Sequence, residues 1–190
     1  MAIATQGALA AQAGGFVGGG IGMTPDYEGS DDYEAAAAFF GRYTWESGRY
    51  VALSGTTGAG QAARIKVNLV PESMSDMWHA GPVLQFRNER DDVDNDKVDS
   101  MRKVDSAVEA GAFLGLQSGP WAGSLTYATD VSDEHDGSLI EIEGSYMVAM
   151  NERLHLTFGA NLTYADDDYM DSYFGVNAAD AAASGLPVYS

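Results

Sequence analysis

Apolar residues alternate with polar or small residues along most of the chain. Residues 154–164 are the clearest case, because every even position there is apolar and every odd position is polar or glycine. Successive side chains of a β-strand point to opposite faces of the sheet. This segment is therefore predicted to be a strand with one apolar and one polar face.

The same period returns in other parts of the chain. Trp121, Leu125 and Tyr127 share one face of residues 121–128, and Glu141 and Glu143 alternate with apolar residues in the strand that follows. About ten segments read as strands in this way. They are residues 15–24, 34–44, 49–55, 62–69, 79–87, 107–117, 121–129, 138–150, 154–164 and 169–176.

Repeated alternating strands of about ten residues are typical of a transmembrane β-barrel. Only a closed sheet satisfies its backbone hydrogen bonds inside lipid. The predicted fold class is therefore all-β, an antiparallel up-and-down transmembrane β-barrel. The alternative is a soluble β-sandwich, whose strands would also alternate. The strand lengths favour the barrel, as do aromatic residues near strand ends, which suit the aromatic girdles of such barrels. These residues are Trp45, Trp78, Trp121, Tyr127, Tyr146 and Tyr164.

The connections between the predicted strands are of two kinds. Those after the second, sixth and eighth strands are short and rich in turn-forming residues, whereas residues 26–32, 91–105, 130–136 and 166–171, which follow odd-numbered strands, are acidic. Odd-numbered connections of an up-and-down barrel share one end, and outer-membrane barrels keep their short turns in the periplasm. We therefore expect the acidic loops at the cell surface and the N-terminus in the periplasm.

Composition narrows the class of protein further. A chain of 190 residues is enough for one domain, and its net charge of −18 excludes a general nucleic-acid-binding surface. No window approaches the roughly 18 consecutive apolar residues of a membrane helix. Residues 1–14 are expected to be a leader, either a truncated secretory signal or a disordered segment, and residues 15–190 the barrel domain.

Three groups of residues are candidates for a metal or catalytic site. Asp92, Asp94 and Asp96 have the spacing of a calcium loop, but lysines, Lys97 and Lys103, stand where such a loop needs glycine and glutamate. A solvated surface loop is the better interpretation. His79, His135 and His155 have no local nucleophile motif, although His155 is predicted to face the lumen beside Thr157.

The third group consists of charged residues on the predicted lumen faces. Three glutamates, Glu109, Glu141 and Glu143, are expected near the basic residues Arg64, Lys66 and Arg87. Paired carboxylates can do acid–base chemistry, but lumen charges more often pair with basic partners and fill the interior of a barrel. The sequence therefore predicts no enzyme, no catalytic, cofactor or metal site, and no cofactor.

Several motifs occur in the order of a known family. They are residues 24–33 (TPDYEGSDDY), 81–87 (GPVLQFR) with 90–91, 108–113 (VEAGAF), 164–166 with 169–170, 173–176 (YFGV) and 184–186 (SGL). Together they resemble the MipA/OmpV family of outer-membrane proteins, also called the MltA-interacting protein family. The residues that carry the resemblance as signature candidates are Pro25, Asp26, Tyr27, Gly29, Tyr33, Arg90, Asp91, Glu109, Tyr169, Met170, Ser184 and Gly185.

The resemblance implies a scaffolding protein of the Gram-negative outer membrane. Such a protein would contact outer-membrane lipid and link a murein-degrading lytic transglycosylase with a penicillin-binding protein. It also implies a barrel of about twelve strands, so we expect this chain to be a fragment that lacks the last strands. A passive small-solute channel is the first alternative, and an outer-membrane enzyme, for which no nucleophile motif is present, is the second.

Overall fold

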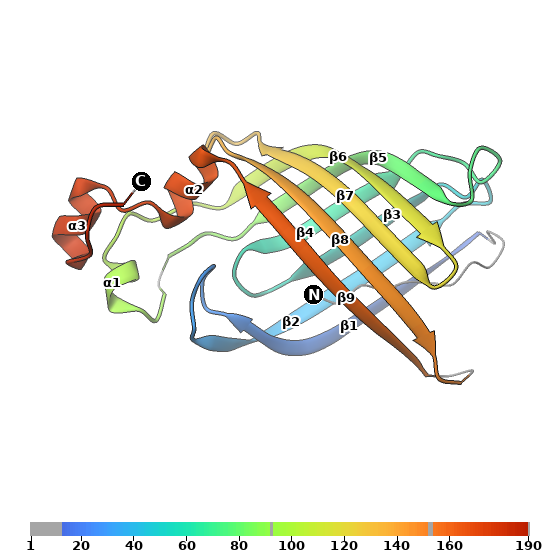
Figure 1. Ribbon diagram of the computed structural model, residues 1–190, viewed down its shortest axis with the longest axis horizontal. Coiled ribbons are helices and arrows are strands. Elements are labelled where there is room, and N and C mark those ends of the chain that lie inside the picture. The colour runs from blue at the N-terminus through green and yellow to red at the C-terminus, as the bar shows by residue number, and fades with distance from the viewer. Residues whose placement is uncertain (1–12, 92, 152–153, 190) are drawn as a thin grey trace.

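A computed structural model describes residues 13–91, 93–151 and 154–189. Within these residues, nine strands form one antiparallel sheet, in which each strand pairs with the next one along the chain (Figure 1). The strands are β1 (Gly14–Pro25), β2 (Tyr33–Thr44), β3 (Tyr50–Thr56), β4 (Gln61–Asn68), β5 (Trp78–Arg87), β6 (Ala107–Ser118), β7 (Trp121–Asp130), β8 (Ser138–Ala149) and β9 (His155–Ala165). This order confirms the predicted all-β, up-and-down fold.

The two faces of the sheet differ in chemistry as the alternation predicts. Ile142 lies opposite Leu162 and Tyr146 opposite Phe158, all on the outer face. Leu162 keeps 66% of its surface exposed, whereas Arg64 on the inner face keeps only 3%. The molecule therefore buries charge inside and exposes apolar side chains outside, the arrangement that a lipid environment favours. The aromatic residues expected near strand ends are all exposed: Trp45, Trp78, Trp121, Tyr127, Tyr146 and Tyr164.

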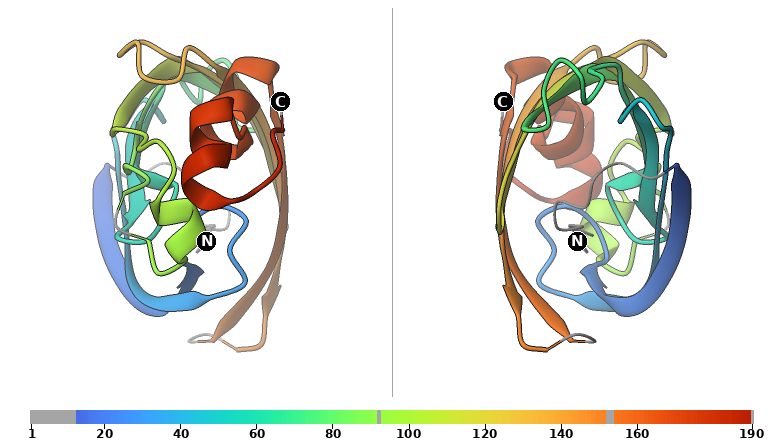
Figure 2. Two further views of the ribbon diagram at one scale, coloured as in Figure 1. Left: turned by 90° about the vertical axis from the view of Figure 1, so that its left-hand side faces the viewer. Right: turned by 90° about the vertical axis from the view of Figure 1, so that its right-hand side faces the viewer.

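The sheet curls around an interior but its two outermost strands remain apart (Figure 2). Within the described residues, β1 pairs only with β2, and β9 only with β8. A cavity of about 940 Å³ reaches both strands, because Gly20 and Ile21 of β1 and Asn161 and Thr163 of β9 all line it. The described part of the fold is therefore a half-barrel with an open seam.

The predicted tenth strand, residues 169–176, is wrong. The chain forms helix α2 (Asp167–Phe174) there, followed by α3 (Ala178–Ser184). Asp166 caps the N-terminus of α2, because its carboxylate accepts a hydrogen bond from the backbone N–H of Tyr169, and two further aspartates occupy the first helical turn. A third helix, α1 (Asp96–Asp99), lies in the connection between β5 and β6. None of the helices in the described residues is long and apolar enough to span a membrane.

The connections separate into two groups, as predicted. Those that follow odd-numbered strands lie at one end of the sheet together with the three helices, and we call this the acidic end (Figure 1). The other connections form the turn end, where residues 69–77 make the longest one. The predicted turn at residues 151–153 lies partly outside the described residues. How these two ends are oriented in a membrane stays a prediction, as do the leader at residues 1–14 and the boundaries of the barrel domain.

Candidate functional site

The lumen at the acidic end is organised around Glu109 of β6. Its side chain is 1% exposed. One carboxylate oxygen accepts a hydrogen bond from Nε of Arg87 at 2.7 Å, and the other accepts one from Nε2 of Gln85 at 2.8 Å. Nε2 of His135 lies 3.2 Å from the first oxygen. Since a buried carboxylate is costly unless it is paired and hydrogen-bonded, these contacts explain how Glu109 is tolerated here.

Arg87 connects this group to the loop between β1 and β2 and to α2. Its Nη1 donates to Glu28 Oε1 at 2.9 Å, and the hydroxyl of Tyr169 donates to the other Glu28 oxygen at 2.5 Å. The guanidinium lies 5.0 Å from the ring centroid of Tyr169, which stacks on Tyr173 at 4.5 Å. Three segments far apart in the sequence thus meet across the lumen, and we call this group of residues the mouth cluster: Glu28, Arg87, Glu109, His135, Tyr169 and Tyr173.

The loop after β7 fixes the tautomer of His135. Its Nδ1 accepts a hydrogen bond from the backbone N–H of Gly137 at 3.0 Å, so the ring proton stands on Nε2, which faces Glu109. Asp130 holds the loop itself by accepting hydrogen bonds from the backbone N–H groups of four of its residues. His135 therefore donates from Nε2 to Glu109 in the mouth cluster.

The two tyrosines of α2 remain protonated in this setting. Burial raises the pKa of Tyr169 well above its ordinary value; the positive charge of Arg87 opposes this shift and the Glu28 carboxylate reinforces it. Burial likewise raises the pKa of Tyr173. The Tyr169 hydroxyl therefore stays un-ionised while it donates a hydrogen bond to Glu28. Such a contact suits a structural role, holding α2 against the loop that carries Glu28, rather than acid–base catalysis.

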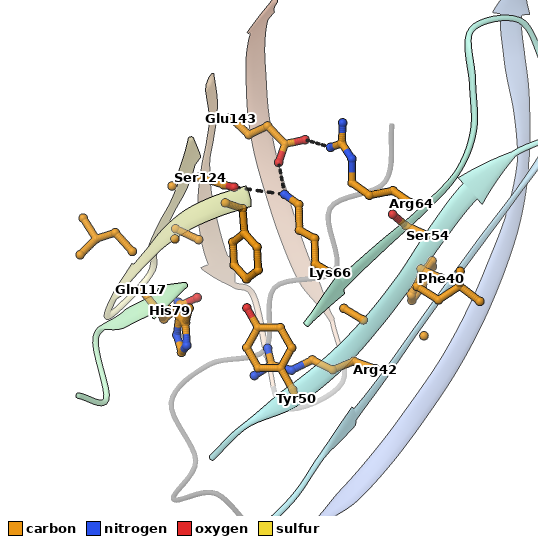
Figure 3. Close-up of a pocket in the computed structure, with 18 of the residues that line it drawn as sticks. Phe40, Arg42, Tyr50, Ser54, Arg64, Lys66, His79, Gln117, Ser124 and Glu143 are labelled. Carbon is orange, nitrogen blue, oxygen red and sulfur yellow. Dashed lines mark hydrogen bonds and ion pairs between the residues drawn. The ribbon is translucent and has the colours of Figure 1, made fainter. Parts of the chain in front are cut away.

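A second group of charges crosses the lumen between β4 and β8. Arg64 forms ion pairs with Glu141 and Glu143, the latter at 3.3 Å. Lys66 contacts Glu143 at 3.3 Å and donates to Ser124 Oγ at 3.1 Å (Figure 3). We call Arg64, Lys66, Glu141 and Glu143 the cross-lumen cluster. The predicted pairing of lumen glutamates with basic residues is confirmed in both clusters.

Most of the signature candidates come together at the acidic end. Pro25 and Tyr33 are paired where β1 ends and β2 begins. Asp26 accepts a hydrogen bond from the backbone N–H of Asp94 at 2.9 Å. Tyr27 and Arg90 line a common pocket of about 320 Å³. These contacts join the connection after β1 and the connection after β5 into one surface.

The remaining candidates mostly shape the backbone around this surface. Gly29 has a φ of 98°, and Gly185 a φ of 72° at the end of α3, a region that favours glycine. Arg90 donates to the backbone oxygens of Tyr173 and Arg102. Asp91 forms an ion pair with Lys103.

Met170 and Ser184 lie apart from these contacts. Met170 lines the cavity at the seam, and Ser184 bonds within α3, so Ser184 and Gly185 do not join the mouth cluster. That the signature positions carry a function stays a prediction.

The remaining candidates are the aspartates with the spacing of a calcium loop and His155. Asp96 is the first residue of α1, and Asp92 lies outside the described residues. In the part of the chain that the structure describes, no group of three or more His, Asp or Glu side chains is arranged to hold a metal ion. His155 follows the inward-facing register of Thr157, as predicted. Sequence reasoning missed Glu28, His135 and Tyr173 as partners in the mouth cluster.

An antiparallel up-and-down sheet with apolar residues outside and paired charges inside is typical of a membrane β-barrel protein, since a soluble sandwich turns its apolar residues toward a core. A model of the family described as MltA-interacting protein MipA matches residues 17–190, and the chain therefore belongs to this family. No match was found among curated proteins or among solved structures.

Proposed function

We propose that this protein is a scaffold in the outer membrane of a Gram-negative envelope, where it holds a lytic transglycosylase beside a penicillin-binding protein. The family match over residues 17–190 carries this proposal, since the name of the family describes an interaction with MltA. The apolar outer face suits contact with membrane lipid. No step of the proposal requires catalysis by this chain.

The lumen supports a binding role more than free conduction. The cross-lumen cluster connects β4 to β8, and the mouth cluster connects β5 and β6 to the loop carrying Glu28 and to α2. Charged side chains that are paired and hydrogen-bonded across an interior resist displacement, because separating a buried pair leaves an uncompensated charge. Both clusters therefore obstruct a path along the axis.

The partner is expected to dock at the turn end, which the predicted topology places in the periplasm. Residues 69–77 form the longest connection there, and Met74 within it is 76% exposed. Exposed methionines adapt their shape to a partner surface and are enriched at interfaces. Leu69 and Met77 of the same connection are also exposed. This loop is the proposed contact surface.

A co-precipitation experiment tests the scaffold. The full chain, solubilised from envelopes in mild detergent, should retain the lytic transglycosylase, and Met74→Glu should weaken this retention. Val131→Glu is the matched control, because Val131 is an exposed apolar residue at the acidic end. Failure of the wild-type chain to retain the transglycosylase would refute the scaffold, and an equal loss in both variants would refute the proposed surface.

The alternative function is a passive channel, which the cavity of about 940 Å³ at the seam favours. Single-channel recording in planar bilayers separates the two functions. The scaffold predicts no stable conductance from the wild-type chain. Steady conductance that increases in Arg64→Ala, a variant that opens the cross-lumen cluster, would instead establish the channel.

A further inference from the structure

A third cavity lies inside the lumen toward the turn end, and its charge is opposite to that of the whole protein. It has a volume of about 220 Å³, and Arg42, Arg64 and Lys66 all line it (Figure 3). The only carboxylate among its lining residues within the described chain is Glu143. Three of the ten lysines and arginines thus gather at one small cavity of a chain with a net charge of −18.

Arg42 supplies the positive charge that this cavity leaves uncompensated. Its Nε donates to Thr44 Oγ1 at 3.2 Å, and its guanidinium lies over the ring of Tyr50 at 3.7 Å. Within the described residues, no ion pair joins Arg42 to a carboxylate, whereas Lys66 and Arg64 share Glu143. A partly buried cation without a counterion is costly, and an anion placed beside it would remove this cost.

The walls of the cavity are apolar and aromatic. Phe16, Phe40, Tyr50 and Phe113 enclose it together with Leu116. Figure 3 shows the basic side chains and the Tyr50 ring surrounding the same space. A few convergent charged groups on a mostly apolar lining are typical of sites for small organic ligands. The acidic connections, which would repel an anion, lie at the other end of the sheet.

We infer that this cavity binds a small organic monoanion, with the acid group against Arg42 and an apolar or aromatic body against Phe40, Tyr50 and Phe113. A volume of about 220 Å³ suits a compound of about one ring, so the proposed ligand is a free small molecule and not a membrane lipid. This site is independent of the proposed scaffold surface at residues 69–77.

A charge series on the purified full chain in a neutral detergent tests the site. Benzoate, benzamide and benzylamine have the same ring and differ in charge, and calorimetric titration measures each one. Saturable binding of benzoate that is at least ten-fold tighter than that of benzamide, without detectable binding of benzylamine, is the expected result. Inorganic phosphate binding as tightly as benzoate would contradict the role of the aromatic walls, and the absence of saturable benzoate binding would overturn the inference.

Two variants locate the site. Arg42→Gln should weaken benzoate binding by about ten- to a hundred-fold, the loss that a hydrogen bond to a charged group accounts for. Lys97→Gln removes the same charge from the exposed surface of α1 and should leave the affinity unchanged. Equal affinities in the two variants would contradict the assignment. If Arg42→Gln fails to fold, the charge series on the wild-type chain still decides between the outcomes.

Discussion

Replacing Glu109 by glutamine tests the mouth cluster most severely. The substitution keeps the shape of the side chain but removes the negative charge that two donors of Arg87 and the Nε2 proton of His135 approach. Removing one partner of a buried ion pair costs about 3–5 kcal/mol, because the other charge remains buried. Arg87 keeps its 2.9 Å contact with Glu28, which is more exposed. We therefore expect a loss near the lower limit, about 3 kcal/mol.

Urea unfolding of the protein in lipid vesicles, followed by tryptophan fluorescence, measures this loss. Glu134→Gln is the matched control, since Glu134 is an exposed side chain in the loop after β7 and its replacement should change stability by less than about 0.5 kcal/mol. The double variant Arg87→Met, Glu109→Gln removes both charges. It should be more stable than the sum of the two single losses predicts, because directly contacting charges are coupled.

A free energy of unfolding for Glu109→Gln within about 0.5 kcal/mol of the wild type would refute this reasoning. Strict additivity in the double variant would also do so, since it would mean that Arg87 and Glu109 do not stabilise one another.

Three further predictions concern lipid contact, topology and pH. Leu162→Arg on the outer face should destabilise the protein in vesicles by about 2–4 kcal/mol if residue 162 lies near the bilayer midplane. Asn161→Arg should be tolerated, because Asn161 lines the cavity at the seam. Equal losses of stability in the two variants would contradict a lipid-facing β9. Cysteines placed at Ser100 and Ser118 should differ in intact cells, with a membrane-impermeant reagent labelling position 100 alone; labelling of position 118 alone would reverse the orientation. Burial would raise the pKa of Asp166, but hydrogen bonds from the backbone N–H groups of Ser138 in β8 and Tyr169 in α2 outweigh burial and lower the pKa. The stabilising contribution of Asp166 is therefore fully present above the ordinary carboxyl pKa and is lost as the pH falls through the lowered one. Asp166→Ala should therefore cost about 0.5–2 kcal/mol at neutral pH and less in acid, and a pH-independent loss would contradict the capping role.

The strands and their faces could be predicted from the sequence because a period of two determines them directly. Ile142 and Glu143 differ by one position, and the sheet places them on opposite faces. The sequence places Glu143, Arg64 and Lys66 all on the lumen side and so predicts that acidic and basic side chains pair there. It does not predict which residues pair. Which strands face each other across the interior depends on curvature, which the pattern does not encode.

The helix at residues 167–174 was missed although its signals are present. Tyr169 and Tyr173 are four residues apart, a helical spacing, and Asp166 is a suitable capping residue. The sequence pattern of residues 169–176 predicts a strand instead. His135 and Glu28 could not be assigned to the mouth cluster from sequence, because two loops bring them to Glu109 and Arg87 across long separations in the chain.

The central claim is that the sheet exposes its apolar face to lipid and encloses its polar face, and spin-label accessibility along β7 tests it most directly. A nitroxide is placed in turn at Ser124, Leu125, Thr126 and Tyr127 of the protein in vesicles. Collision with oxygen, which concentrates in hydrocarbon, is compared with collision with a water-soluble nickel chelate. Our account predicts that oxygen dominates at 125 and 127 but not at 124 and 126. Equal accessibility at all four positions, or dominance of the nickel chelate at 125 and 127, would contradict it.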